Sequence, residues 1–273
     1  MYDIARNTGA YLVEQLGVDR TPVAVFAGRK MVTPAYFLGV VYAGRPYAPI
    51  DASLPDKRIE KILENLCPGA IVADRESREH VESIVDELAK AEGFDRPQIF
   101  IAEDISRFEQ VACADSNCKI SESAGDAVTD SENDTDGGVV AGCAGKTDDS
   151  SRDMLAVVRR QMSMTDPLYI IYTSGSTGNP KGVMTSHLSL MTYINAYCDV
   201  MHIEESDVLG NQSPLDYIAA IRDIYLPLKT GCSTAIIPKE YFMEPNALFD
   251  YMNDKKVSSV GWSVSAFTIL TSL

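Results

Sequence analysis

The chain has 273 residues, of which 45% are hydrophobic and 23% charged, a composition typical of a globular protein with enough apolar material for a core. Its 24 lysines and arginines stand against 39 aspartates and glutamates, which gives a net charge of −15. That balance argues against a protein that binds nucleic acid or an anionic membrane, because both partners need a positive surface.

The sequence carries no signal for export, membrane insertion or metal binding. No apolar run follows a basic start, and nowhere do about 18 apolar residues stand together, so we expect a cytoplasmic protein. The six cysteines and three histidines are scattered, and no Cys-x-x-Cys pair occurs. We therefore expect reduced thiols and no metal site formed by these side chains.

In the N-terminal third, short apolar runs alternate with segments of helical periodicity. The apolar runs predict buried strands at 22–27, 46–50, 70–73 and 98–101. The periodic segments predict helices at 34–43, 54–66 and 77–91. Strands that alternate with helices favour parallel βαβ units, so the predicted fold class is α/β with a parallel sheet between helical layers.

The composition changes abruptly between residues 112 and 153. This segment has no Phe, Trp, Tyr, Leu or Met, and its ten acidic residues against three basic ones give a net charge of −7. Such a segment cannot bury enough apolar surface to offset its chain entropy, so we predict a mobile insertion. The predicted organisation is a first α/β part at 1–111, the insertion at 112–153 and a second α/β part at 154–273. Alternating acids at 130–138 suggest a calcium loop, but the closing Glu and flanking helices are missing.

The alternation resumes after the insertion. The predicted helices lie at 153–162, 186–201, 218–228 and 245–252, with Ser186 as a cap and Gly231 as a stop. The predicted strands or extended pieces lie at 168–172, 207–209, 234–237 and 257–262.

Residues 172–183 read Tyr-Thr-Ser-Gly-Ser-Thr-Gly-Asn-Pro-Lys-Gly-Val. Glycines allow backbone N–H groups to approach an anion, hydroxyls add donors, and a lysine adds positive charge. The pattern is neither a Walker A loop nor G-x-G-x-x-G, because Lys181 lies between Pro180 and Gly182 and the segment leads into a strand. A Ser/Thr/Gly linker is the alternative, which the preceding strand and the Pro-Lys-Gly-Val continuation disfavour. The predicted phosphate-binding residues are Thr173, Ser174, Gly175, Ser176, Thr177, Gly178 and Lys181.

On these residues the sequence resembles the phosphate loop of AMP-forming acyl-adenylate ligases, and more specifically the adenylation domains of nonribosomal peptide synthetases and D-alanine:carrier-protein ligases. Two further stretches agree. Residues 40–51 resemble the family's helix end followed by a Tyr-x-Pro-Ile-Asp strand, and residues 224–231 resemble its helix that ends in Leu-Thr-Gly behind the substrate pocket. The resemblance covers nearly the whole chain except 112–153.

The resemblance implies a two-step chemistry. A carboxylate attacks the α-phosphorus of MgATP to give acyl-AMP and pyrophosphate, and the phosphopantetheine thiol of a carrier protein then takes the acyl group. ATP and Mg²⁺ are thus the implied cofactors, a carboxylic acid and a carrier protein the implied partners, and Lys181 the catalytic cation facing the β- and γ-phosphates. The family's magnesium-binding Glu, ribose-binding Asp and C-terminal Lys have no counterpart here, so we interpret the chain as an N-terminal portion that alone makes no acyl-adenylate.

Two residues bear on which acid is activated. Amino-acid-activating relatives usually place an Asp, which pairs with the substrate ammonium, where family spacing puts Ile218 in this chain. Ile218 would leave an ammonium desolvated without a partner, so the substrate would lack a free α-amino group. If the segment is shifted, Asp216 pairs with the ammonium and an amino acid is accepted. Asp216 also fits a plain helix N-cap.

Three more residues are candidates for a structural role, and for two of them a binding role is the alternative. Trp262 either lines the acyl pocket, as the resemblance implies, or is a core residue. His187 opens the helix after the phosphate loop, with either a structural or a binding role. Asp51 is expected to hold the turn before Pro55.

Two other functions compete with the ligase. The first is a non-catalytic interaction module that keeps the fold and uses the acidic insertion to bind a basic partner. The second is a P-loop-like nucleotide hydrolase, which the missing Walker pattern disfavours.

Overall fold

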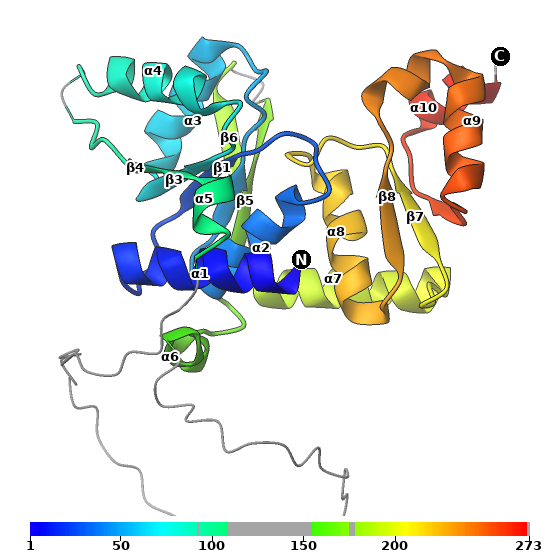
Figure 1. Cartoon of the computed structure of the whole chain (residues 1–273), viewed down its shortest axis with the longest axis horizontal. Helices are drawn as coiled ribbons and strands as arrows, with labels where there is room; N and C mark the ends of the chain where they lie inside the picture. Colours follow the sequence, from blue (N-terminus) through cyan, green and yellow to red (C-terminus); the bar gives the residue numbers. More distant parts are fainter. Residues whose placement is uncertain (92, 109–153, 175–177, 272–273) are drawn as a thin grey trace, which may run out of the picture.

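A computed structural model of the chain describes residues 1–91, 93–108, 154–174 and 178–271 (Figure 1). The predicted insertion at 112–153 lies outside the described residues, as do three predicted phosphate-binding residues, Gly175, Ser176 and Thr177. The division of the chain at 111 and 154 therefore stays a prediction.

The larger sheet has six strands in the order β4-β3-β1-β2-β5-β6. Its strands are β1 (Val23–Phe26), β2 (Tyr47–Pro49), β3 (Ala70–Ala73), β4 (Gln98–Ile101), β5 (Pro167–Ser174) and β6 (Pro180–Ser186). The predicted strands of the N-terminal third are all present, and the pairs among the first five strands are parallel. Strand β6 is the exception, because it pairs antiparallel with β5. A connection this short can join only antiparallel strands.

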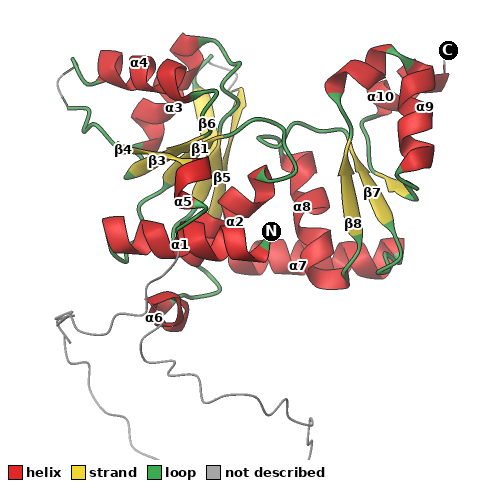
Figure 2. Cartoon of the chain, viewed as in Figure 1, coloured by secondary structure: helices red, strands yellow, loops and turns green. Residues whose placement is uncertain are grey.

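Helices cover both faces of this sheet (Figure 2). They are α1 (Tyr2–Leu16), α2 (Thr33–Tyr42), α3 (Asp56–Leu66), α4 (Arg78–Leu88), α5 (Ala102–Ile105) and α6 (Met154–Gln161). Alternate residues of β1 serve the two layers: Val23 and Val25 join the core with α1, α2, α5 and α6, whereas Ala24 and Phe26 join the core with α3 and α4. This period of two is the expected consequence of the pleat. Helix α1 was not predicted from the sequence.

The second sheet has three parallel strands in the order β8-β7-β9. It comprises β7 (Val208–Asn211), β8 (Ser233–Ile236) and β9 (Ser259–Val260), with helices α7 (His187–Met201), α8 (Ile218–Thr230), α9 (Pro245–Asp254) and α10 (Val264–Thr271) and the 3-10 turn η1 (Lys239–Met243). The hydroxyl of Ser186 accepts a hydrogen bond from the Ser189 amide at 3.2 Å, which confirms the predicted cap of α7. The last strand is shorter than the predicted 257–262. Within the described ranges, no helix combines the length and apolar character needed to span a membrane.

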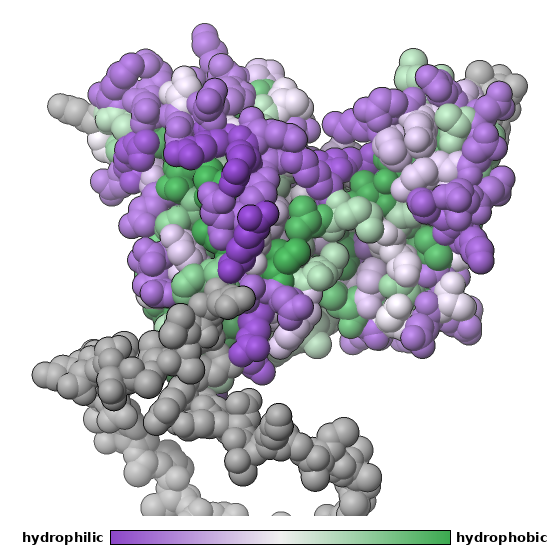
Figure 3. Space-filling model, in the orientation of Figure 1, coloured by the Kyte–Doolittle hydropathy of each residue, from purple (hydrophilic) through white to green (hydrophobic). Residues whose placement is uncertain are grey.

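Hydrogen bonds from Arg29 and from Tyr225 join the two sheets. The Arg29 guanidinium, which follows β1, donates hydrogen bonds to the backbone carbonyls of Ile237 and Asn211 and to the Asn211 side chain, the latter at 2.8 Å. The Tyr225 hydroxyl of α8 donates to the Tyr47 hydroxyl of β2 at 3.3 Å. Helix α8 therefore lies between the two sheets, and Figure 3 shows apolar side chains gathered along this junction.

Removing the Arg29 guanidinium should loosen the junction. Arg29→Ala leaves carbonyls at the nearly inaccessible residues Asn211 and Ile237 without their charged donor, at an expected cost of about 3 kcal/mol in the free energy of unfolding. Urea denaturation measures this loss. Arg75→Ala is the matched control, because Arg75 follows β3 and its side chain makes an exposed ion pair with Asp104, worth about 1 kcal/mol or less. Equal losses in the two variants would contradict the role given to Arg29.

Candidate functional site

The candidate site lies where the strands of the larger sheet have their carboxyl ends, which we call its carboxyl edge. Strands β1, β2 and β5 run parallel, so their carboxyl ends meet at the same edge. In open α/β sheets, ligands bind outside the carboxyl ends of the strands. The segments that leave this edge are Gly28–Arg29 after β1, the turn at Asp51 after β2, and the β5–β6 hairpin.

The β5–β6 hairpin contains the predicted phosphate-binding residues. Ser174 pairs with Pro180, and Thr173 pairs with Lys181. Gly178 has φ +77° and open space around its Cα, so a left-handed backbone rather than crowding requires glycine there. The side chains of Ser174 and Lys181 are exposed. Lys181 is the second residue of strand β6, not part of a loop, so its backbone is held by the ladder while its ammonium is free to reach a ligand.

Thr173 is less available than its neighbours. Its hydroxyl donates to the Lys181 carbonyl at 3.4 Å, across the hairpin. The contact is long and lies at the surface, so it is weak. Ser174, Gly178 and Lys181 are exposed, as is Thr173 apart from this contact.

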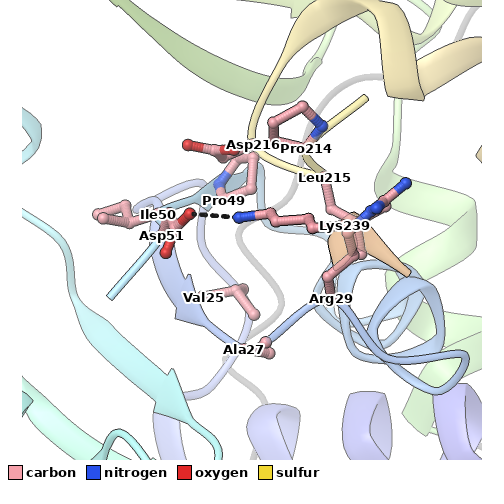
Figure 4. A pocket seen from close by; sticks show the side chains of 11 residues that line it. Val25, Ala27, Arg29, Pro49, Ile50, Asp51, Pro214, Leu215, Asp216 and Lys239 are labelled. Atoms are coloured by element: carbon pink, nitrogen blue, oxygen red, sulfur yellow. Dashed lines mark ion pairs between the residues drawn. The ribbon is translucent and has the colours of Figure 1, made fainter. Parts of the chain in front are cut away.

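A small cavity of about 80 Å³ opens between this edge and the segment that precedes α8 (Figure 4). Its lining includes Asp51 after β2, Asp216 before α8 and Lys239 of η1, together with Arg29 and its neighbours at the end of β1. The Lys239 ammonium lies 3.9 Å from the Asp51 carboxylate. Asp51 also accepts a hydrogen bond from the Ser53 amide at 2.8 Å, which confirms its expected role in the turn.

Asp216 and Ile218, the two residues expected to decide which acid is activated, lie in different surroundings. Asp216 faces the small cavity, and its pKa is raised above the ordinary value by burial and by the negative charge of Asp51. It is not the helix N-cap, because Tyr217 occupies that position and makes no side-chain cap. Ile218 is the first residue of α8, is 49% exposed and does not line the small cavity.

Trp262 and His187 are both tied into the fold. Trp262 lies between β9 and α10, its indole N–H donates to the Gly210 carbonyl at 2.8 Å, and its ring packs against Phe242. His187 begins α7, and its backbone amide donates to the Asp166 carbonyl at 3.2 Å. Burial lowers the pKa of its imidazole, which favours the neutral form. Neither contact involves the hairpin or the small cavity.

A buried polar chain on α8 was not predicted. Asp223 accepts from the Asn211 side chain at 2.9 Å and from Arg222 Nε at 2.7 Å. Arg222 also donates to the Gly261 carbonyl at 3.0 Å and lies over the Tyr197 ring. An Arg-Asp pair inside the otherwise apolar segment 218–228 is the signal that would have found it, since buried charges are normally paired.

A second cavity, of about 260 Å³, is mainly apolar and is lined by residues of α8 and β8 together with Met1, Met31 and Pro34. Leu215 lines both cavities. The polar side chains on its wall include Asn211 and Asp223, which already satisfy each other. In the part of the chain that the structure describes, no three His, Cys, Asp or Glu side chains come together as a metal site.

The fold and the motif together match known proteins. The family model for AMP-binding enzymes matches residues 1–272. The chain belongs to the AMP-binding enzyme family. It is 28% identical over 240 residues to a D-alanine--D-alanyl carrier protein ligase from Bacillus velezensis, which is 88% of this chain and 37% of that ligase. The chain thus spans well under half the length of that curated relative.

Two solved structures share the fold of this chain. ATP-bound MatB from Rhodopseudomonas palustris superposes with a TM-score of 0.67 at 18% identity, covering 99% of this chain and 45% of that one. The fatty acyl-adenylate ligase from L. pneumophila, in complex with acyl adenylate and pyrophosphate, superposes with a TM-score of 0.65 at 18% identity, covering 97% and 38%. The α/β fold, with its largely parallel sheet, is that of adenylate-forming enzymes.

Neutralising Asp216 should stabilise the protein at neutral pH. Because the pKa of Asp216 is raised in the folded state, the folded chain holds the proton more tightly than the unfolded chain does. Stability therefore falls as pH rises from the ordinary pKa through the raised one, and stays lowered at pH 7. Asp216→Asn should raise the Tm at pH 7 and not at pH 3. Asp250→Asn, which removes an exposed carboxyl of α9, is the control. A lower Tm at pH 7 for Asp216→Asn would show that the charged form is stabilised instead.

Proposed function

We propose that the protein containing this chain activates a carboxylic acid with ATP to an acyl-adenylate and transfers the acyl group to a carrier-protein thiol. The observation that carries the proposal is the β5–β6 hairpin, which presents Gly178 and the exposed Lys181 at the carboxyl edge of the sheet. A relative named as a carrier protein ligase and a similar structure that holds ATP support it.

In this proposal the hairpin binds the phosphates of ATP. Lys181 supplies the countercharge to the β- and γ-phosphates, and Ser174 and Thr173 supply hydroxyl donors. Gly178 lets the backbone turn so that amides face the anion. Gly175, Ser176 and Thr177 remain sequence-based members of the same site. Departure of pyrophosphate builds negative charge on the leaving oxygens, which is where a fixed cation lowers the barrier most.

Mg²⁺ is not assigned to residues of this chain. The two carboxylates at the small cavity, Asp51 and Asp216, share it with the Lys239 ammonium, a poor set of ligands for a divalent cation. When bound with ATP, the ion supplies charge neutralisation on the phosphates.

The acid is proposed to bind near the start of α8, where Ile218 and Trp262 are the candidate contacts. Ile218 offers no partner to an ammonium, which favours an acid that lacks a free α-amino group. Asp216 supports the other outcome, because a half-buried carboxylate with a raised pKa gains from an ammonium partner. The carrier protein and a cytoplasmic location remain part of the proposal.

Lys181→Ala should weaken ATP binding without changing the fold. Loss of one charged phosphate contact costs about 1.5–3 kcal/mol, roughly ten- to hundredfold in Kd. Isothermal titration calorimetry with ATP measures the change, and an unchanged Tm excludes unfolding. Lys229→Ala removes an equal charge from an exposed site on α8 and should leave Kd within about twofold. Equal affinities of Lys181→Ala and the parent for ATP would show that Lys181 does not bind the phosphates.

The substrate preference of the whole protein decides between Ile218 and Asp216 as the residue that faces the acid. Acid-dependent exchange of labelled pyrophosphate into ATP by the whole protein should be strong with aryl or fatty acids and weak with the standard α-amino acids. Ile218→Asp should then shift the preference toward amino acids, because it supplies the missing partner for the ammonium. Robust exchange with an α-amino acid, lost in Asp216→Ala and kept in Asp250→Ala, would assign the acid site to Asp216.

A further inference from the structure

Helix α3 runs beside the β5–β6 hairpin and contacts both of its sides (Figure 1). Two side chains of α3 make the polar contacts, Lys61 and Asn65. They are four residues apart, so they project from the same side of the helix. Nothing in the phosphate-binding proposal uses either of them.

The first contact fixes the β5 side of the hairpin. The Tyr172 hydroxyl donates to the Asn65 side-chain oxygen at 2.9 Å. The Tyr172 ring reaches α3 by crossing Gly182 of β6, where a Cβ would lie 3.1 Å from Tyr172 Cζ and 2.9 Å from Ile170 Cγ2. A side chain at Gly182 would therefore crowd both the Ile170 side chain and this ring. Burial raises the pKa of the phenol to about 12, with Cys67 as a smaller cause, so the hydroxyl stays a donor.

The second contact fixes the β6 side. The Lys61 ammonium donates to the Asn179 side-chain oxygen at 3.0 Å. Asn179 directly precedes Pro180, the first residue of β6, and lies two residues before Lys181. Lys61 makes no ion pair with a carboxylate among the described residues, so this amide is its polar partner. The two contacts thus bracket the turn, one on each side.

We propose that α3 is the platform of the phosphate hairpin, with Lys61, Asn65 and Tyr172 as positioning residues that hold Lys181 and Gly178 at a fixed place over the carboxyl edge. The inference rests on the proposed function, since it assumes that the hairpin binds the phosphates of ATP. It divides the motif into two roles: Gly178 shapes the turn that meets the ligand, and Gly182 admits the ring that anchors the turn. Free hairpins are easily displaced, and a site that must face developing charge works only when its donors are fixed beforehand.

The test uses the Tyr172→Phe, Lys61→Ala double variant of the full chain. Tyr172→Phe keeps the ring over Gly182 and removes only the hydroxyl, and Lys61→Ala removes the second contact. Hydrogen exchange of the amides at 178–183, measured without nucleotide, should rise at least threefold in the double variant. Calorimetry with ATP should show a Kd at least threefold weaker, and Lys61→Arg, which keeps a donor, should bind like the parent.

The control is Lys57→Ala, which removes an equal charge from an exposed position of α3 one turn away. It should change neither exchange nor Kd. Unchanged exchange in the double variant would overturn the anchoring, and raised exchange with unchanged Kd would overturn the positioning role. If the parent chain binds no ATP, the proposed function fails, while the exchange measurement still decides whether α3 anchors the hairpin.

Discussion

The hydrogen bonds of the Arg29 guanidinium are the interaction on which the junction of the two sheets and its small cavity depend. A partly buried cation needs several acceptors, and Arg29 finds them at the carboxyl ends of β7 and β8, in Asn211 and Ile237. This requirement brings the carboxyl edge of the larger sheet against that of the smaller one. The Asn211 side chain also donates a hydrogen bond to Asp223, and Asp223 accepts one from Arg222. A continuous series of polar contacts therefore runs from the first sheet through the junction into α8.

The small cavity follows from that junction. Asp51 leaves the first sheet, Lys239 leaves the second, and Asp216 belongs to the segment that crosses between them. These three charged side chains lie close together because the carboxyl ends of the two sheets face each other. The resulting burial raises the pKa of Asp216. The β5–β6 hairpin lies at the same edge of the larger sheet but is held by α3 rather than by the junction. The two parts of the site are therefore supported independently, and a change at one need not disturb the other.

Hydrophobic periodicity predicted the elements whose buried faces are apolar and failed where they are not. The strand at Val23–Phe26 is buried throughout and was predicted, as was α3, whose buried positions are Ile and Leu. Helix α1 was missed because its buried face contains Thr8, Gly9 and alanines, which give no apolar period. The motif at 172–183 located the hairpin, but its spacing holds no information on which side chain points to solvent. The Arg29 contacts join residues that are 182 and 208 positions apart in the chain, and no local pattern encodes them. The Asp223 contacts are more local, and the Arg-Asp pair within an apolar segment was the overlooked signal.

A signature motif taken from sequence alone suggests one role for all its residues, and the structure contradicts that simplification. Glycine at 178 is demanded by a left-handed backbone with nothing nearby, whereas a Cβ at 182 would crowd the Ile170 side chain and the Tyr172 ring. A substitution at the first strains the turn itself, and one at the second pushes the ring off the strand. Both would weaken a phosphate site, but through different atoms. The same motif thus combines residues that face a ligand with residues that face α3, and only the packing against that helix tells them apart.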